Sequence, residues 1–241
     1  MTEPPPARSA CNAGAGTSPR RVVFVLYPGM APLDLAGMRL DYAWHDLLAV
    51  TGEQAQAPFT FSPPVTFEQL RKVDILCVTG TDNPFAVLND NALLDWLAAV
   101  GPSAHWVTSV GSGSILLAAA GLLDGYRAAG HWAMLEELGL FGAAPSDERV
   151  VIDRNRMSGA GVTSGIDFSL ALIELLFGRP LAQQVQLQMQ YDPQPPLAAG
   201  TPVQAGARVS AKAWEQVFAR VRLGTPDYQA RLMAAQRRLR D

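Results

Sequence analysis

Continuous apolar runs alternate with amphipathic segments along this chain. Residues 21–27 and 73–79 are apolar runs that end at Pro28-Gly29 and at Gly80, a pattern typical of strands buried on both faces. Apolar residues recur at helical spacing over residues 89–100. Alternation of buried strands with helices predicts an α/β fold, a three-layer sandwich in which helices cover both faces of a mostly parallel sheet.

Residues 105–121 predict a strand, a tight turn and a helix. The strand is rich in β-branched residues, the segment Gly111-Ser112-Gly113-Ser114 reverses the chain, and helix-forming residues follow. A strand that turns sharply into a helix is a nucleophile elbow, which presents its turn residue above the sheet. Here that residue is Gly111, which offers no nucleophile.

The flanking segments complete the predicted organisation of the chain. Patterns predict a helix from Leu33 to about Val50, a helix over 133–138, and a hairpin around Arg154 and Asn155. We expect a disordered leader at 1–20, one α/β domain at 21–202, and a C-terminal extension at 203–241 made of two amphipathic helices.

Composition narrows the classes of function. The 241 residues are 49% hydrophobic with a formal net charge of −3, which gives no electrostatic reason to bind nucleic acid or a membrane surface. No apolar run approaches the roughly 18 residues of a transmembrane helix. Cys11 and Cys77 cannot form a disulfide framework, so we expect a cytoplasmic protein. His45, His105 and His131 form no metal-ligand pattern, and we expect neither metal nor cofactor.

Four candidate site segments follow predicted strands. They are Asp34, the segment Gly80-Thr81-Asp82, the elbow at Gly111, and the region of His131. In sheets of this kind ligands bind beyond the carboxyl ends of the strands. The sequence therefore predicts that these places meet at one pocket.

Five blocks of the sequence together resemble the PfpI-type superfamily, whose fold is flavodoxin-like, and within it the isocyanide (isonitrile) hydratases. The blocks occur in order at fitting distances. They are Leu33-Asp34-Leu35-Ala36-Gly37, Asp74-Ile75-Leu76-Cys77-Val78-Thr79-Gly80, the elbow, Gly130-His131-Trp132, and Gly161-Val162-Thr163-Ser164-Gly165-Ile166-Asp167-Phe168. The region from Gln186 to Gly200 resembles the C-terminal part of those hydratases. Related transcriptional regulators add a DNA-binding domain, for which we expect the residues after Pro202 to be too few.

The resemblance implies roles for individual positions. In these hydratases an elbow cysteine attacks the isocyanide carbon, assisted by an aspartate and backbone N–H donors. Gly111 stands at the cysteine's position, Asp34 matches the aspartate, and Ser112 stands where a threonine usually follows. The family's Pro-Gly-Gly turn is Thr79-Gly80-Thr81 here, and its Gly-Pro is Gly37-Met38. Several positions facing the site thus differ together, which looks like a pocket put to another use.

The candidate catalytic residues are Asp34, Ser112 and His131. Asp34 could transfer a proton if burial raises its pKa, or it could cap a helix. Ser112 could be a displaced nucleophile with His131 as its base, or a helix N-cap or hydrogen-bond donor. His131 could equally be a satisfied core histidine. The candidate substrate-binding residues are Gly80, Thr81, Asp82, Gly111, Gly113 and Trp132, although Asp82 also fits an ordinary turn and Trp132 core packing.

Two functions follow from these residues. The first is a small-molecule enzyme that hydrates, dehydrates, cyclises or isomerises an apolar substrate, polycyclic or biosynthetic, by non-covalent acid–base chemistry. Asp34 would move the proton, and the N–H groups of Ser112 and Gly113 would hold developing negative charge. Hydration of an isocyanide by water directly is a variant of it. The second is an inactive ligand-binding or sensor protein. The resemblance implies a homodimer in either case.

Overall fold

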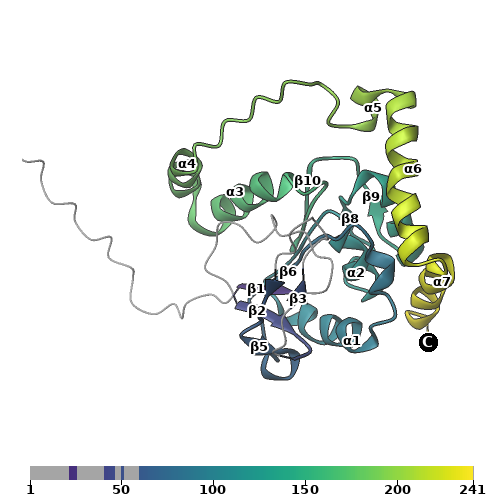
Figure 1. Cartoon of the computed structure of the whole chain (residues 1–241). Coiled ribbons are helices and arrows are strands. Elements are labelled where there is room, and N and C mark those ends of the chain that lie inside the picture. Colours follow the sequence, from purple (N-terminus) through teal and green to yellow (C-terminus); the bar gives the residue numbers. More distant parts are fainter. Residues whose placement is uncertain (1–21, 26–40, 47–49, 52–59, 241) are drawn as a thin grey trace, which may run out of the picture.

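The computed structural model describes residues 22–25, 41–46, 50–51 and 60–240 (Figure 1). The strands are β1 (Val22–Val25), β2 (Asp41–Trp44), β3 (Val50–Thr51), β4 (Thr60–Phe61), β5 (Val65–Thr66), β6 (Ile75–Val78), β7 (Trp106–Val110), β8 (Arg127–Ala128), β9 (Ala144–Pro145), β10 (Val150–Asp153) and β11 (Arg156–Gly159). The α-helices are α1 (Asn91–Val100), α2 (Gly113–Ala119), α3 (Ser164–Phe177), α4 (Arg179–Gln188), α5 (Pro202–Ala205), α6 (Ala207–Gly224) and α7 (Tyr228–Arg238).

The main sheet of the described residues has the strand order β10-β11-β7-β6-β1-β2-β5. All neighbouring pairs are parallel except β10 and β11, which form the predicted hairpin. Figure 1 shows α3 and α4 on one side of this sheet and α1 and α2 on the other. The predicted flavodoxin-like sandwich with a mostly parallel sheet is confirmed.

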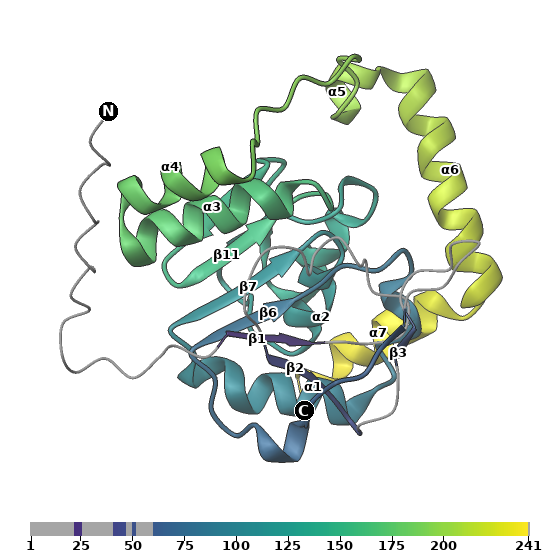
Figure 2. The ribbon, with the colours of Figure 1, turned by 60° about the vertical axis from the view of Figure 1, so that its left-hand side comes forward.

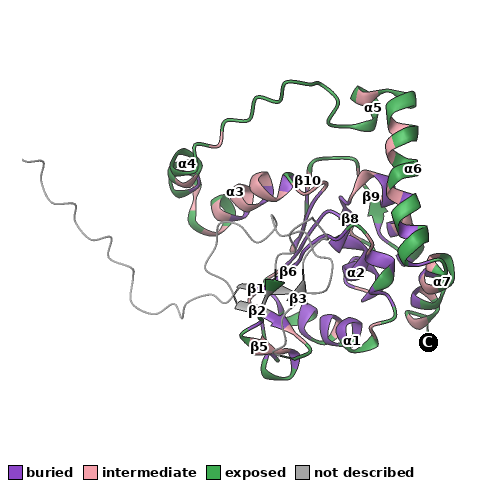
Figure 3. Cartoon of the chain, viewed as in Figure 1, coloured by how far each residue is buried: buried purple, intermediate pink, exposed green. Residues whose placement is uncertain are grey.

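The core lies between the central strands and α2. All four residues of β6 are buried, Cys77 among them, as a strand covered on both faces requires. Every residue of α2 is buried as well, and Figure 3 shows both elements in the colour of burial. Because α2 carries mainly small and aliphatic side chains, it can pack close to the ends of β6 and β7.

The elbow itself depends on a close approach between backbones. A Cβ on Gly113 would lie 2.4 Å from the carbonyl oxygens of both Val78 and Thr79. Only glycine therefore lets the first turn of α2 rest against the end of β6. The position of the elbow above the sheet follows from this contact.

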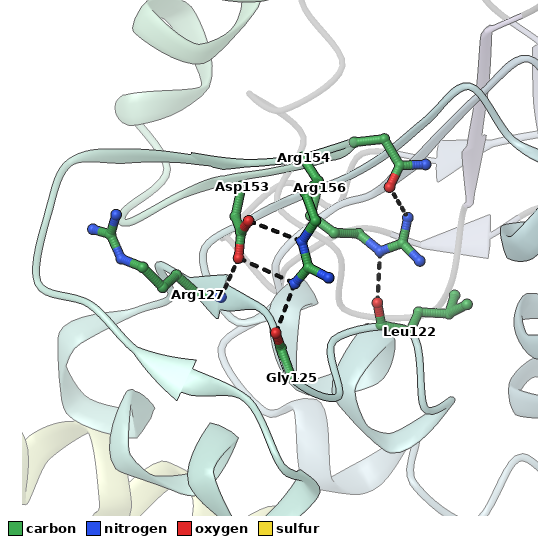
Figure 4. Close-up of polar contacts among 7 residues, drawn as sticks. Leu122, Gly125, Arg127, Asp153, Arg154 and Arg156 are labelled. Carbon is green, nitrogen blue, oxygen red and sulfur yellow. Dashed lines mark hydrogen bonds and ion pairs between the residues drawn. The ribbon is translucent and has the colours of Figure 1, made fainter.

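Arginine side chains fasten the β10–β11 hairpin to the segment after α2 (Figure 4). Arg154 bonds Asp153 and donates to the Gly125 carbonyl over 2.6 Å, and Arg156 donates to the Leu122 carbonyl over 2.6 Å. Both guanidinium groups also lie over the ring of Tyr126, at 3.5 and 4.5 Å from its centroid. The hairpin in turn supports the elbow, because the carbonyl of Gly159 at the end of β11 accepts the N–H of Gly111 over 2.9 Å.

The C-terminal helices extend away from the α/β body before they return to it. Figure 2 shows a long loop that leads from α4 to α5, after which α6 runs back to α7. No residue of α5 is buried, and Figure 3 shows this loop as exposed. In α6 the buried residues are Phe218 and Val221, near its C-terminal end, so α6 docks through that end alone.

The structure corrects two sequence predictions. The helix predicted from Leu33 to about Val50 is wrong at residues 41–44, which form β2. Tertiary pairing with β1 and β5 overrides the helical pattern there, and Ala43 is fully buried between them. The predicted helix at 133–138 is instead two 3₁₀ helices, Trp132–Met134 and Glu136–Phe141. Within the described residues, no helix is long and apolar enough to cross a membrane.

Candidate active site at the elbow

Gly111 occupies the turn between β7 and α2 with a backbone φ of +59°, a conformation that favours glycine. The Ser114 hydroxyl donates to the Gly111 carbonyl over 2.9 Å and holds the turn in place. A Cβ on Gly111 would find its nearest described neighbours at 3.8 and 3.9 Å, in Ala160 and Gly80. The elbow thus keeps the shape and the space for a nucleophile but lacks its side chain.

The hydroxyl of Ser112 is engaged by the segment that follows β6. It donates to the Thr81 carbonyl and accepts the Thr81 N–H over 2.9 Å. Ser112 stands at the N-cap of α2, but its side chain makes no capping hydrogen bond. This buried hydroxyl uses both its donor and its acceptor position on the backbone of Thr81. Ser112 therefore joins the elbow to the neighbouring strand end.

A pocket of about 140 Å³ opens beside the elbow. It is lined by Gly80, Thr81, Asp82, Gly111, Ser112, His131, Met134, Val162, Val217 and Arg220. A cavity of about 150 Å³ is large enough for a benzene molecule, so the enclosed space suits a single ring. This volume favours a smaller substrate than the polycyclic one considered from the sequence.

His131 faces this pocket as a partly buried, neutral base. Burial lowers the pKa of its imidazole below the usual value, because desolvation disfavours the charged form. Its Nδ1 accepts the N–H of Ala133 over a long 3.4 Å, and its ring lies 5.8 Å from that of Trp132. No hydrogen bond in the described structure joins His131 to Ser112, so the two do not form the nucleophile–base pair of a hydrolase in this state.

Two charged side chains, Asp82 and Arg220, also line the pocket. Asp82 belongs to the turn after β6, in which the Thr81 hydroxyl accepts the N–H of Asn83 over 3.3 Å. The turn chemistry expected from the sequence is therefore present, and Asp82 is exposed at this turn. Arg220 comes from α6, in the last part of the chain.

The structure brings together most of the predicted site residues. Gly80, Thr81, Asp82, Gly111, Ser112 and His131 all line the pocket. Gly113 and Trp132 are not among its lining residues, and Gly113 acts in packing instead. Asp34, the predicted proton-transfer group, lies outside the described residues.

Four lining residues escaped the sequence analysis: Met134, Val162, Val217 and Arg220. Val162 stands in the turn before α3, within one of the blocks that carry the family resemblance. Val217 and Arg220 belong to α6, for which the sequence predicted an amphipathic helix of the C-terminal extension and no part in the site. Among the described residues, no group of three or more histidine, cysteine, aspartate or glutamate side chains could hold a metal ion.

These features define the class of protein. It is a flavodoxin-like α/β protein with a strand-turn-helix elbow and a small pocket at the carboxyl ends of its parallel strands. The sequence pattern of the DJ-1/PfpI family matches residues 25–175, and the chain belongs to this family.

Two relatives span most of the chain. An isonitrile hydratase from Pseudomonas putida is 37% identical over 215 residues, which cover 85% of this chain and 93% of that protein. The crystal structure of a THiJ/PfpI family protein from Pseudomonas syringae superposes with a TM-score of 0.80 at 32% identity. That match covers 95% of this chain and 97% of the other.

A third relative has a different function. The HTH-type transcriptional regulator CdhR from Pseudomonas aeruginosa is 33% identical over 150 residues. The match covers 61% of this chain but only 44% of the regulator. The family thus includes regulators of transcription, and the expectation that this chain binds no nucleic acid stays a prediction.

Proposed function

We propose that this protein is a small-molecule enzyme, related to the isonitrile hydratases, that works by acid–base chemistry without a covalent cysteine intermediate. The observation that carries the proposal is Gly111, which keeps the elbow conformation at φ +59° and lines the pocket without a nucleophilic side chain. A catalytic site of this shape without a nucleophile can still bind and polarise a substrate. The reactions that fit are hydration or dehydration, cyclisation and isomerisation, including those of biosynthetic intermediates.

Each residue of the site has a part in this proposal. Asp34 transfers the proton, and the backbone N–H of Ser112, which lines the pocket, holds negative charge that develops on the substrate. His131 lines the pocket as a neutral imidazole, which can donate or accept a hydrogen bond without adding charge. In the hydration of an isocyanide, water would add its oxygen and a proton to the terminal carbon, the nitrogen would gain the other proton, and a formamide would result.

The first test measures binding and turnover separately. Compounds that raise the melting temperature are incubated with the wild-type protein and with Asp34→Asn, and product is followed by mass spectrometry. We expect Asp34→Asn to bind as tightly as the wild type but to turn over about 10²- to 10⁴-fold more slowly, the usual contribution of a general acid or base.

The matched control is Asp147→Asn, which removes an exposed carboxylate that does not line the pocket. We expect it to keep turnover within a few-fold of the wild type. Equal turnover by the wild type and Asp34→Asn would contradict the proposed role of Asp34. A covalent adduct in the intact-protein mass would contradict the non-covalent mechanism.

A second candidate function is an inactive ligand-binding or sensor protein on the same scaffold. The engagement of the Ser112 hydroxyl by Thr81 favours it, because that hydroxyl then offers no replacement for the missing nucleophile. In this case both proteins bind the same compounds and neither converts them.

Three further expectations remain proposals. The family resemblance implies a homodimer, and we propose one for this chain. The apolar part of the pocket wall supports a small apolar substrate. The composition and the cysteine content support a cytoplasmic location.

A further inference from the structure

Arg220 is a cation that lines the pocket without a partner. Within the described part of the chain, its guanidinium makes no hydrogen bond and no ion pair, and the residue is exposed. It lies three residues after Val217, so both side chains are on one face of α6. Val217 thus contributes an apolar side chain to the pocket wall, and the guanidinium of Arg220 lies next to it on the same face of α6.

Three other arginines of the C-terminal helices are paired with carboxylates. Arg222, two residues further along α6, bonds Glu215 over 2.5 Å. In α7, Arg231 bonds Asp227 over 3.0 Å and Arg238 bonds Asp95 of α1. Arg208 and Arg237 of the same helices make no such pair among the described residues, but neither lines this pocket, so Arg220 is distinguished by its free donors and its place in the pocket wall together.

The rest of the pocket wall does not neutralise this cation. Val162, Val217 and Met134 are apolar, and His131 adds no charge near neutral pH because burial lowers its pKa. Asp82 is the one carboxylate among the lining residues of the described chain, and it makes no ion pair with Arg220. A ligand can therefore supply the negative partner that Arg220 lacks.

We propose that the substrate is a small carboxylic acid with an apolar body, and that Arg220 binds its carboxylate. The planar guanidinium fork matches the two oxygens of a carboxylate, and such charge-assisted pairs are among the stronger hydrogen bonds in proteins. The apolar body, about the size of one ring, fits the 140 Å³ between Met134, Val162 and Val217. The inference rests on the proposed function in one respect: it takes this pocket as the substrate site.

Three probes of one shape and different charge test the inference. Benzoate, benzamide and benzylamine share a ring that suits the pocket, and their dissociation constants are measured by isothermal titration calorimetry at low salt. We expect the wild type to bind benzoate about tenfold more tightly than benzamide, as one charge-assisted pair allows, and benzylamine more weakly than either.

Variants assign the preference to Arg220. We expect Arg220→Gln to weaken benzoate binding about tenfold and to leave benzamide unchanged. Arg220→Lys keeps the charge but loses the fork, so its affinity for benzoate lies between the two. Arg222→Gln, which removes the same charge from the same helix outside the pocket, is the matched control and should change neither affinity.

Several outcomes would overturn the inference. They are equal affinity of the wild type for benzoate and benzamide, tighter binding of benzylamine, a loss of benzoate affinity in Arg222→Gln as large as in Arg220→Gln, or no benzoate binding at millimolar concentration. Because binding is measured without turnover, the outcome is separate from the test of Asp34. If Asp34→Asn converts substrate normally while Arg220→Gln still weakens benzoate, the acid–base proposal fails and the carboxylate site stands.

Discussion

At the scale of single residues, two glycines of the elbow have different physical reasons to be glycine. Gly111 needs its positive φ, but a Cβ there would meet its nearest neighbours among the described residues only at 3.8 and 3.9 Å. Gly113 has no space, since its Cβ would lie 2.4 Å from two carbonyl oxygens. Gly111 therefore leaves the turn without a nucleophilic side chain, while Gly113 allows the close backbone contact that forms the elbow.

We predict that alanine at these two positions has unequal effects on stability. Gly111→Ala should cost about 1–2 kcal/mol of unfolding free energy, the strain of a left-handed residue with a Cβ. Gly113→Ala should cost about 3 kcal/mol or more, because backbone atoms must move apart. Urea denaturation of both variants measures the difference. Equal losses would show that the contact between α2 and the end of β6 is not as close as described.

At the scale of elements, the hydroxyl of Ser112 connects α2 to the turn after β6. It bonds both the N–H and the carbonyl of Thr81, and Thr81 lies in the pocket wall next to Asp82. One buried side chain thus holds together two strand ends that contribute to the same pocket. This explains a buried serine at the elbow without giving it a chemical step.

We predict that Ser112→Ala lowers the unfolding free energy by about 1–3 kcal/mol, because the buried backbone groups of Thr81 lose their partner. The matched control is Ser103→Ala, whose hydroxyl donates over 2.9 Å to the Val100 carbonyl at a partly buried site. Its loss should be smaller, about 0.5–1.5 kcal/mol. Thermal or urea unfolding compares the two variants, and a loss in Ser112→Ala no larger than the control would argue against the connection.

At the scale of the whole molecule, the C-terminal end of α6 completes the pocket. Phe218 is 2% exposed and stacks on Trp214 at 4.3 Å, while its ring lies 6.4 Å from that of Phe85, which follows β6. This aromatic contact fixes the face of α6 that presents Val217 and Arg220 to the elbow. A helix that sequence patterns assigned to an extension is therefore part of the candidate site.

We predict that Phe218→Ala weakens both the fold and the pocket. Removing a buried aromatic ring should cost about 3–5 kcal/mol, and benzoate affinity should fall as Arg220 loses its fixed position. Leu223→Ala on the same helix is the control: Leu223 is 87% exposed, so its loss should stay within about 0.5 kcal/mol. Unfolding and calorimetry of both variants measure these effects, and similar behaviour would mean that Phe218 does not hold α6 against the body.

Much of the fold could be predicted from the sequence because its signals are local. The apolar run at β6, the turn residues of the elbow and the hairpin around Arg154 and Asn155 each lie within a few neighbouring residues. The strand β2 could not be predicted, because pairing with β1 and β5 stabilises it against a helical pattern. For the same reason the lining residues that follow β6 and β7 were predicted, whereas those from α6 were not.

The sequence by itself determined that this is a parallel α/β protein with an elbow whose central position is Gly111, since periodicity and glycine placement depend only on nearby residues. The tertiary structure alone decided which groups share the pocket, which hydrogen bonds they make and how burial shifts their pKa. It joined Ser112 to Thr81, placed His131 where burial lowers its pKa, and brought Arg220 of α6 to the elbow. These results depend on contacts between segments that are distant along the chain, and no local pattern in the sequence encodes such contacts.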